Sequence, residues 1–432
     1  ETREGMMIKK IRAEELDVGM FVTDFNTPWL NHPFVGNRLF IRTVRDITNV
    51  LKQGIVEVYI DTDKGKDSLK AITVDEADTA LHGRLREEFA AARHPQDPVP
   101  ETPFEEELRK AREIHGDAKE VVRTTFEAVR RGGNVDGERN RATVTKMIDS
   151  IFSNRDALLT LARIKTFDEY TLCHCLNVAI LTLHLGVSLG IVQEELVRLG
   201  TGAILHDIGK VRLPPGLVAK GERLTPREAE LVKSHAAQGA DILFQCPTLS
   251  SDTVEVALNH HERYDGSGYP RGLSTLEIGK FGLIVAIADV YDAMTSSRAH
   301  QAQLSPTLAL SRIFEWAGSY FHPIYAKQFI RCLGIYPIGS VVALDTGEVG
   351  VVVHENRQHS LHPLVRLCRA KDGRPLPEPI DVDLLDPDPS GRKGYARTIQ
   401  KVLPSHTAGL DVDTILARRP NPRGAEPMIA VL

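Results

Sequence analysis

The sequence predicts a mainly helical protein with a small α/β unit at its N-terminus and a small β module near its C-terminus. Three observations predict this fold class. Residues 141–335 show helical spacing of apolar residues in one segment after another. Residues 7–70 mix short strand patterns with one helical pattern, and from Gly339 onward apolar runs alternate with glycine turns. At 432 residues, the chain is long enough for two or three domains.

The first predicted domain, residues 1–70, is a small α/β unit. Leu39–Ile41 and Ile55–Ile60 have the composition of strands. Between them, Thr43–Gln53 has the spacing of an amphipathic helix, and Gly54 provides its end. The order strand, helix, strand is what predicts an α/β unit here.

The next region, residues 71–140, is predicted to be a helical linker. A helix is expected over Val74–Ala92, and the proline-rich run 95–103 follows as a break because proline cannot continue a helix. Phe104–Arg131 is strongly charged and has helical periodicity. Such a helix is either solvated or forms a homodimer contact, and its charge favours the solvated alternative.

Residues 141–335 are predicted to form an all-helical domain that carries the chemistry. Helices are expected over Asp168–Leu189, Gln193–His206 and Ile278–Met294. The last of these is long and apolar, as a buried central helix should be. Another helix is expected to begin at Thr225, whose side chain can cap the first turn while Glu228 completes a capping box.

The predicted β module, residues 336–402, begins with a hairpin. Ser340–Leu344 and Val349–Val353 are apolar runs that flank an Asp-Thr-Gly turn. A third strand, Leu364–Leu367, precedes an Asp-Gly turn. The tail, residues 403–432, is rich in proline and arginine and is expected to be loose.

Composition restricts the partners and the location that we expect. The formal net charge of −5 argues against a nucleic-acid polymer as partner, whereas a small anionic ligand needs only a local positive site. We find no apolar run of about 20 residues that predicts a membrane segment, and no signal-peptide core. The five cysteines are scattered without paired CxxC motifs, so we expect a cytoplasmic protein without a cysteine-rich zinc site.

Metal-type residues gather in the predicted helical domain. They are His174, His206, Asp207, His235, His260, His261 and Asp289. A lone histidine on a helix is more often structural than a ligand, so we assign no role to His32, His184 and His322. Asp289 differs, because it interrupts an apolar helix where an unpaired carboxylate is costly and needs a cation or donors.

We interpret this set as a two-metal site that shares Asp207. Adjacent residues on a helix point about 100° apart, so His206 and Asp207 can approach one metal from different sides. A carboxylate has two oxygens and can bridge two cations. The first metal would take His174, His206, Asp207 and Asp289, and the second would take Asp207, His235, His260 and His261. Imidazole and carboxylate ligands suit Fe, Mn, Ni, Co or Zn without choosing among them.

The chemistry expected of such a site is hydrolysis of a phosphoester. Two metals about 3.5–4 Å apart lower the pKa of bound water and hold a bridging hydroxide that can attack phosphorus. Asp207 therefore has a catalytic role as well as a ligand role. Lys210 lies one helical turn beyond His206, where it can hold the phosphate or assist the leaving oxygen. A solvent-facing lysine at a helix end is the alternative.

Three motifs of this chain resemble the HD-GYP family. They are His206–Lys210, His260–Pro270 and Ile287–Ser296, and Asp168–Val178 is similar to the family's opening motif. The resemblance covers residues 145–335. It implies an HD-type phosphohydrolase core that hydrolyses the bacterial messenger cyclic di-GMP to linear pGpG, and in some members onward to GMP.

The resemblance also implies roles for individual residues. The seven metal-type residues would hold two divalent ions, with iron or manganese expected before nickel, cobalt or zinc. Lys210, Asp292 and Arg298 would bind the substrate, and a guanidinium suits a phosphate through paired donors. Two departures from the family stand out. Tyr170 replaces a glutamate that binds a third metal in some members, and Arg298 is followed by Ala299, His300 and Gln301 instead of proline, tyrosine and a basic residue.

The loop that contains Gly268, Tyr269 and Pro270 has a physical interpretation of its own. Gly268 permits backbone conformations that other residues avoid, and Pro270 holds Tyr269 extended. A rigid aromatic loop beside a site suggests stacking on the substrate or contact with a partner, and in the family it resembles a docking loop for diguanylate cyclases. A purely structural turn is the alternative.

The sequence is therefore compatible with three functions. The first is an active cyclic di-GMP phosphodiesterase, which the intact ligand set favours. The second is a cyclic di-GMP sensor or adaptor with weak or no catalysis that docks partners through the loop. The third keeps the chemistry and changes the substrate to another cyclic dinucleotide or to pGpG.

Overall fold

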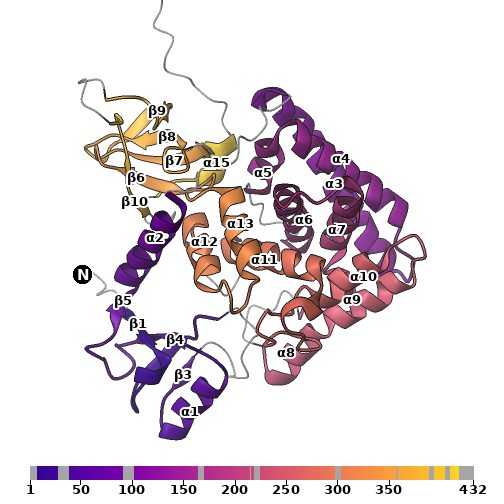
Figure 1. Ribbon diagram of the computed structural model, residues 1–432, viewed down its shortest axis with the longest axis horizontal. Helices are drawn as coiled ribbons and strands as arrows, with labels where there is room; N and C mark the ends of the chain where they lie inside the picture. Colours follow the sequence, from indigo (N-terminus) through magenta and orange to yellow (C-terminus); the bar gives the residue numbers. More distant parts are fainter. Residues whose placement is uncertain are drawn as a thin grey trace, which may run out of the picture. The chain divides into compact units, whose positions relative to one another are not determined.

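The computed structural model describes most of the chain (Figure 1). The described residues are 7–27, 38–90, 102–163, 170–214, 216–217, 224–296, 303–356, 359–388, 394–403 and 409–417. The chain divides into two compact units, of which the first is Glu1–Arg84 with Leu213–Ser234 and the second is Leu85–Arg212 with His235–Leu432. The finer five-part division that the sequence suggests stays a prediction.

The first unit is built on a five-stranded antiparallel sheet with the strand order β3-β2-β4-β1-β5. Its strands are β1 (Ile8–Arg12), β2 (Phe21–Asp24), β3 (Leu39–Phe40), β4 (Glu57–Asp61) and β5 (Ile72–Thr73), with a short 3-10 turn η1 (Ala13–Glu15). The expected helix is α1 (Val44–Lys52), which Thr43 and Asp46 begin with a capping box. The expected cap of Thr225 and Glu228 is likewise present at α8 (Pro226–Lys233). The unit boundary falls within α2 (Val74–Ala90).

The second unit is dominated by helices. They are α3 (Phe104–Arg130), α4 (Gly137–Ser153), α5 (Arg155–Arg163), α6 (Tyr170–Ser188), α7 (Gln193–Leu205), η2 (Ile208–Arg212), α9 (His235–Phe244), α10 (Ser251–Asn259), η3 (Thr275–Ile278), α11 (Lys280–Thr295), α12 (Pro306–Glu315) and α13 (Pro323–Leu333). α6 packs against both α7 and α11 near the middle of this unit (Figure 1). α11 is buried along almost its whole length, which confirms the expected central helix.

α3 is packed by its apolar side and solvated by its charged side. Ala111, Ala118 and Phe126 are buried in the core that α3 shares with α4, α5 and α6. On the charged side, Arg123 lies 2.6 Å from carboxylate oxygens of both Glu120 and Glu127. The apolar side is therefore covered within the chain.

α6 is the one described helix that is long and apolar enough to cross a bilayer. The qualifying window is Thr171–Ser188, and 72% of it is buried inside the fold. We expected no apolar run close to the length of a membrane span, and this helix is an exception by length and composition. Its apolar surface faces other helices of the second unit, as the core helix of a folded domain requires.

The C-terminal part forms a second five-stranded antiparallel sheet with the order β10-β6-β7-β8-β9. Its strands are β6 (Val341–Leu344), β7 (Val349–His354), β8 (Leu364–Arg369), β9 (Pro375–Asp383) and β10 (Ile399–Leu403). The predicted hairpin is confirmed, and Gly347 takes the positive φ of 91° that its turn requires. The expectation of a loose tail is wrong for α15 (Val412–Ala417), since Ile415 is buried against β6, β7 and β8 residues. The predicted fold class is confirmed.

Candidate metal centre

Seven metal-type side chains from five helices and their ends converge in the second unit. His174 lies in α6, His206 and Asp207 follow α7, His235 begins α9, His260 and His261 follow α10, and Asp289 lies in α11. All of them are buried except His261, whose side chain is 17% exposed. α7 and α10 each end where an adjacent ligand pair begins, and this lets two neighbouring side chains point to different sides of one centre.

Asp207 lies between two groups of histidines. Its Oδ2 is 3.4 Å from His206 Nε2 and 3.7 Å from His174 Nε2. Its Oδ1 is 3.2 Å from His235 Nε2 and 3.9 Å from His260 Nε2. Each oxygen thus faces a different group, which is the arrangement that a bridging carboxylate needs.

Asp289 reaches both groups as well. Its Oδ1 is 3.1 Å from His174 Nε2 and 4.0 Å from His206 Nε2, as expected of a ligand in the first group. Its Oδ2 lies 3.5 Å from His261 Nδ1, a residue that the sequence assigned to the second group. The second aspartate therefore also spans the centre.

Hydrogen bonds behind the histidines decide which ring nitrogen faces the centre. His206 Nδ1 donates to the Ala203 carbonyl at 2.7 Å, and His260 Nδ1 donates to the Ala257 carbonyl at 2.9 Å. Because a carbonyl can only accept, these contacts fix the Nδ1–H tautomer and leave each Nε2 lone pair available to a cation.

At four of the seven residues, burial and the local charges favour the donor state that a cation requires, whereas at His174 the Asp289 and Asp292 carboxylates outweigh burial and raise the pKa of the imidazole. Burial alone would raise the pKa of Asp207, but the Lys210 ammonium outweighs it and holds this pKa well below its usual range. At Asp289, burial would likewise raise the pKa, but the hydrogen bond from His174 outweighs it and holds the pKa well below its usual range. Burial, aided by the neighbouring imidazoles, keeps the pKa of His260 and His261 well below the usual value. The carboxylates are thus ionised while these two imidazoles stay neutral.

These residues fit divalent cations. His206 Nε2 and Asp207 Oδ1 are buried, and neither has a hydrogen-bond partner within the described part of the chain. Unsatisfied polar atoms at the centre of a fold are costly, and a cation between the two histidine groups would satisfy both. Imidazole nitrogens and carboxylate oxygens are donors that first-row divalent metals accept.

A glycine sets how closely the two halves of the centre approach. Gly209 in η2 packs against the start of α9, and a Cβ added to it would lie 2.0 Å from the His235 carbonyl oxygen. Only a residue without a side chain allows this approach. Gly209 therefore brings the His206–Asp207 pair next to His235.

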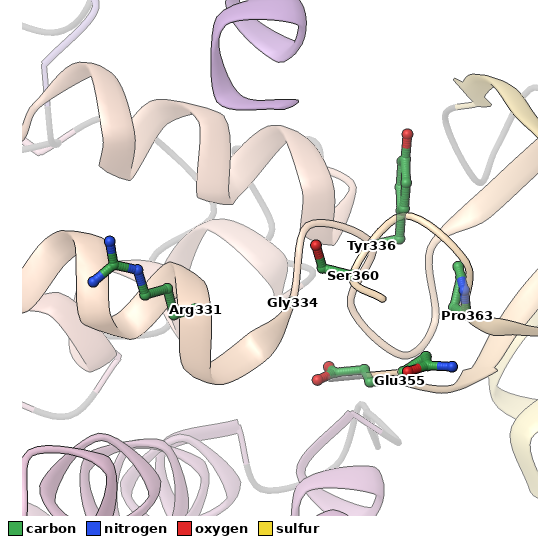
Figure 2. A pocket seen from close by; sticks show the side chains of 7 residues that line it. Arg331, Gly334, Tyr336, Glu355, Ser360 and Pro363 are labelled. Atoms are coloured by element: carbon green, nitrogen blue, oxygen red, sulfur yellow. The ribbon is translucent and has the colours of Figure 1, made fainter. Parts of the chain in front are cut away.

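The hollow shown in Figure 2 lies elsewhere in the second unit. It is lined by Arg331, Gly334, Tyr336, Glu355, Asn356, Ser360 and Pro363, and its volume is about 10 Å³. Such a volume has room for about one water molecule, so a dinucleotide does not fit. The converging histidines and aspartates remain the candidate site.

Two family models and several known proteins match this chain. A model of a domain of unknown function (DUF3391) matches residues 8–139, and a model of the HD domain matches residues 146–324. The cyclic di-GMP phosphodiesterase PA4108 of Pseudomonas aeruginosa is 34% identical over 381 residues, which cover 88% of this chain and 89% of that relative. The chain belongs to the HD-GYP family.

Other relatives match a shorter part. A cyclic di-GMP phosphodiesterase of Thermotoga maritima is 34% identical over 189 residues, which cover 43% of this chain and 50% of that relative, so the match spans half of its length. Among solved structures, Bd1817, an HDG"Y"P protein from Bdellovibrio bacteriovorus, aligns over 74% of this chain and 98% of its own, with 18% identity and a TM-score of 0.45.

The residues that we expected to bind substrate in this HD-GYP chain lie in different places. Lys210 is at the centre, where its ammonium forms an ion pair with Asp207 Oδ2. Asp292 is not on an open surface: its buried carboxylate accepts hydrogen bonds from His174 Nδ1 at 2.7 Å and from Asn177 Nδ2 at 3.1 Å. The contacts thus place Asp292 behind His174, which is expected to be a ligand. Arg298 lies outside the described residues, together with Ala299, His300 and Gln301, and the Tyr170 side chain is not described either.

The GYP loop lies directly beside the HD-GYP centre. Tyr269 stacks on His261, with ring centroids 4.7 Å apart and an angle of 30° between the ring planes. Gly268 packs tightly against backbone atoms of His261, Glu262 and Arg263, and Pro270 is exposed. The loop is thus in contact with a metal-type residue, whichever of its expected roles applies.

Sequence patterns missed two buried polar residues beside the metal-type residues. Asn177 donates to the Asp292 carboxylate, and Glu262 accepts two backbone N–H groups. Asn177 lies three residues after His174, and Glu262 directly follows the histidine pair. This adjacency to ligands was the available signal, but it does not reveal which partner each side chain has.

Proposed function

We propose that this chain is a metal-dependent phosphodiesterase that hydrolyses cyclic di-GMP to linear pGpG, with GMP as the product of any onward cleavage. The observation that carries the proposal is the position of Asp207, which presents one oxygen to each of two histidine groups. The names of the relatives from P. aeruginosa and T. maritima support the substrate.

Two sets of residues would hold the cations. His174, His206 and Asp289 would hold one, His235, His260 and His261 would hold the other, and Asp207 would be shared. When bound, the cations would supply an activated water and neutralise charge on the phosphate oxygens. We expect iron or manganese, and metal analysis of anaerobically purified protein, paired with an activity assay, would identify the ion.

Side chains at the edge of the centre would position the substrate. Lys210 is 20% exposed and pairs with the shared carboxylate, so its ammonium can reach a phosphate placed there. Tyr269 is partly exposed and presents an aromatic ring next to His261, where a base can stack. The same loop would also be the docking surface for a diguanylate cyclase.

Replacement of Lys210 by alanine should slow hydrolysis while both cations stay bound. Loss of one preorganised positive donor at a phosphoryl centre costs about 10²–10³-fold in kcat. The measurement pairs kcat with metal content per chain. Lys280→Ala is the matched control, because Lys280 also pairs with a carboxylate, that of Glu195 at 3.0 Å, on the surface at the start of α11. An unchanged rate for Lys210→Ala would remove this residue from the mechanism.

Replacement of Asp292 by asparagine should weaken the cation bound by His174. The substitution keeps the side-chain volume and removes the negative charge behind the imidazole. Loss of such a supporting carboxylate typically costs about 10–100-fold in metal affinity or activity. Titration of metal-free protein with Mn²⁺ would measure this effect, and unaltered affinity would show that Asp292 does not support the ligand.

Nucleotide chromatography tests the function itself. The protein would be incubated with cyclic di-GMP under reducing conditions with Fe²⁺ or Mn²⁺, and the proposal predicts pGpG as a product. Later formation of GMP would show that hydrolysis continues. Bound substrate without either product, with any of the metals, would favour the sensor or adaptor function instead. That alternative is not favoured, because the complete ligand set converges.

A change of substrate is the other candidate. Some matching relatives from Vibrio cholerae are named 3'3'-cGAMP-specific phosphodiesterases, so this nucleotide belongs in the same assay. We expect kcat/KM to be highest with cyclic di-GMP. A higher value with 3'3'-cGAMP or with pGpG would keep the chemistry and reassign the substrate. We also propose a cytoplasmic location, where this messenger would be encountered.

A further inference from the structure

We infer that Glu262 is a positioning residue of the metal centre: its buried carboxylate closes the GYP loop, so that Tyr269 packs on His261 and holds that imidazole in place. The inference rests on the proposed function, because it concerns the second of the two cation sites. It assigns a role to a residue that touches neither the substrate nor a cation.

The carboxylate of Glu262 links the start of the loop to two residues at its end. It is 1% exposed, and its two oxygens accept the backbone N–H groups of Arg271 at 2.8 Å and of Leu273 at 3.0 Å. Hydrogen bonds from amides to a buried carboxylate are stronger than neutral ones, and leaving a charge of this kind unpaired is costly. The loop between Arg263 and Arg271 is therefore closed onto the residue that follows the histidine pair.

The closed loop lies against the histidine pair. The Tyr269 N–H donates to the His261 carbonyl at 3.2 Å. A Cβ added to Gly268 would lie 2.4 Å from the Arg263 nitrogen and 2.5 Å from the His261 carbonyl oxygen, so glycine alone permits this approach. The phenol ring then stacks on the outer side of the His261 imidazole.

A second tie fixes the same loop to the other side of the pair. Arg271 Nη2 donates to Asn259 Oδ1 at 2.9 Å, and Asn259 Nδ2 donates to the Ile278 carbonyl at 3.0 Å. Asn259 immediately precedes His260. The two histidines are thus bracketed by Asn259 and Glu262, and both of these residues contact Arg271.

His261 is the ligand that depends most on such support. Backbone carbonyls orient His206 and His260 from behind, whereas the described neighbours of His261 are other rings and the Asp289 carboxylate, 3.5 Å from its Nδ1. It is also the most exposed of the seven. If the loop opened, Tyr269 would leave the ring, and the imidazole could rotate away from the second site.

The test is a Mn²⁺ titration of the full chain with Glu262→Gln. Glutamine keeps the shape but offers one acceptor oxygen to two N–H donors, so the loop should loosen. We expect the second Mn²⁺ to bind about 10–100-fold more weakly with the first unchanged, and the electron paramagnetic resonance signal of a spin-coupled manganese pair to be replaced by that of isolated ions. Glu277→Gln is the matched control, since Glu277 is exposed and accepts only local hydrogen bonds, from the N–H and the hydroxyl of Ser274 in a capping box.

A double-mutant cycle separates positioning from a general effect on folding. In a His261→Ala background, Glu262→Gln should not lower the affinity for the second Mn²⁺ any further, because the imidazole through which Glu262 acts is absent. Equal losses in both backgrounds would overturn the inference. Tyr269→Ala, which leaves Glu262 intact, should reproduce the selective loss even if Glu262→Gln does not fold, and normal binding by Tyr269→Ala would contradict it. Wild-type protein that binds no second cation would refute the proposed function, whereas equal binding by wild type and Glu262→Gln would refute only this inference.

Discussion

Asp207→Ala should abolish turnover and empty both cation sites. The carboxylate faces His174 and His206 with one oxygen and His235 and His260 with the other, so its removal takes a ligand from each group. We expect kcat to fall by at least about 10³-fold, because the loss includes the electrostatic stabilisation that both cations provide. Metal content should fall from about two ions per chain to less than one. Mass spectrometry of the metals and nucleotide chromatography measure the two effects on one sample.

Two further substitutions test whether the effect is specific to loss of the Asp207 carboxylate. Asp207→Asn keeps one oxygen and the volume, so it should retain more metal than the alanine variant and still turn over slowly. Asp252→Ala removes a partly exposed aspartate that pairs with Arg198 at 2.8 Å, and it should leave metal content and rate unchanged. Full metal loading together with normal turnover by Asp207→Ala would contradict the shared-carboxylate scheme.

Gly209→Ala should damage the centre although glycine contributes no ligand. The added Cβ would meet the His235 carbonyl oxygen at 2.0 Å and the Gly239 nitrogen at 2.5 Å, and both of these are backbone atoms that cannot rotate away. η2 and α9 must therefore separate, which moves Asp207 away from His235. Overpacking of this kind costs about 1–3 kcal/mol of unfolding free energy, and a misplacement of about 1 Å can cost about 10²-fold in rate.

The comparison that isolates this contact is Gly116→Ala. Gly116 lies in α3, and a Cβ added there would meet nothing within 4 Å. Alanine should be neutral or stabilising by about 0.5–1 kcal/mol at such a helix position. Denaturant unfolding of the two variants, with kcat of each, measures both effects. If Gly209→Ala were as stable and as active as Gly116→Ala, the close packing of η2 on α9 would not define the centre.

The long helices could be predicted because their periodicity extends over many residues. α3, α6, α7 and α11 lie within a few residues of their expected positions. Short strands carry too few residues for a pattern, and β1, β2, β5 and β10 were missed. β9 was missed for a different reason: Pro375, Pro377 and Pro379 argue against a strand, since proline lacks the donor that pairing needs. β9 is tolerated because it lies at the edge of its sheet, where only one side is paired.

The seven metal-type residues could be identified from sequence because metal binding restricts their residue types. Two adjacent pairs, His206–Asp207 and His260–His261, also stand out in the sequence. Their supporting contacts could not be identified in this way. Asp292 follows Asp289 on the same helix and has the same side chain, yet it faces His174 Nδ1 instead of the open side of the centre. Which of two aspartates one turn apart meets a cation depends on the packing of α6 on α11, and this packing is a tertiary property.

The main-chain acceptors behind His206 and His260 have a consequence for mutagenesis. The Ala203 and Ala257 carbonyls belong to the peptide backbone, so no side-chain truncation removes them. Alanine substitution of each residue would therefore detect the contribution of the imidazole side chains. It would not detect the carbonyl groups that orient these rings. Their tautomers would instead be disturbed by changes in helix geometry, for example by a proline placed one turn earlier in α7 or α10. The orientation of His206 and His260 is thus determined in part by the helical geometry of the backbone.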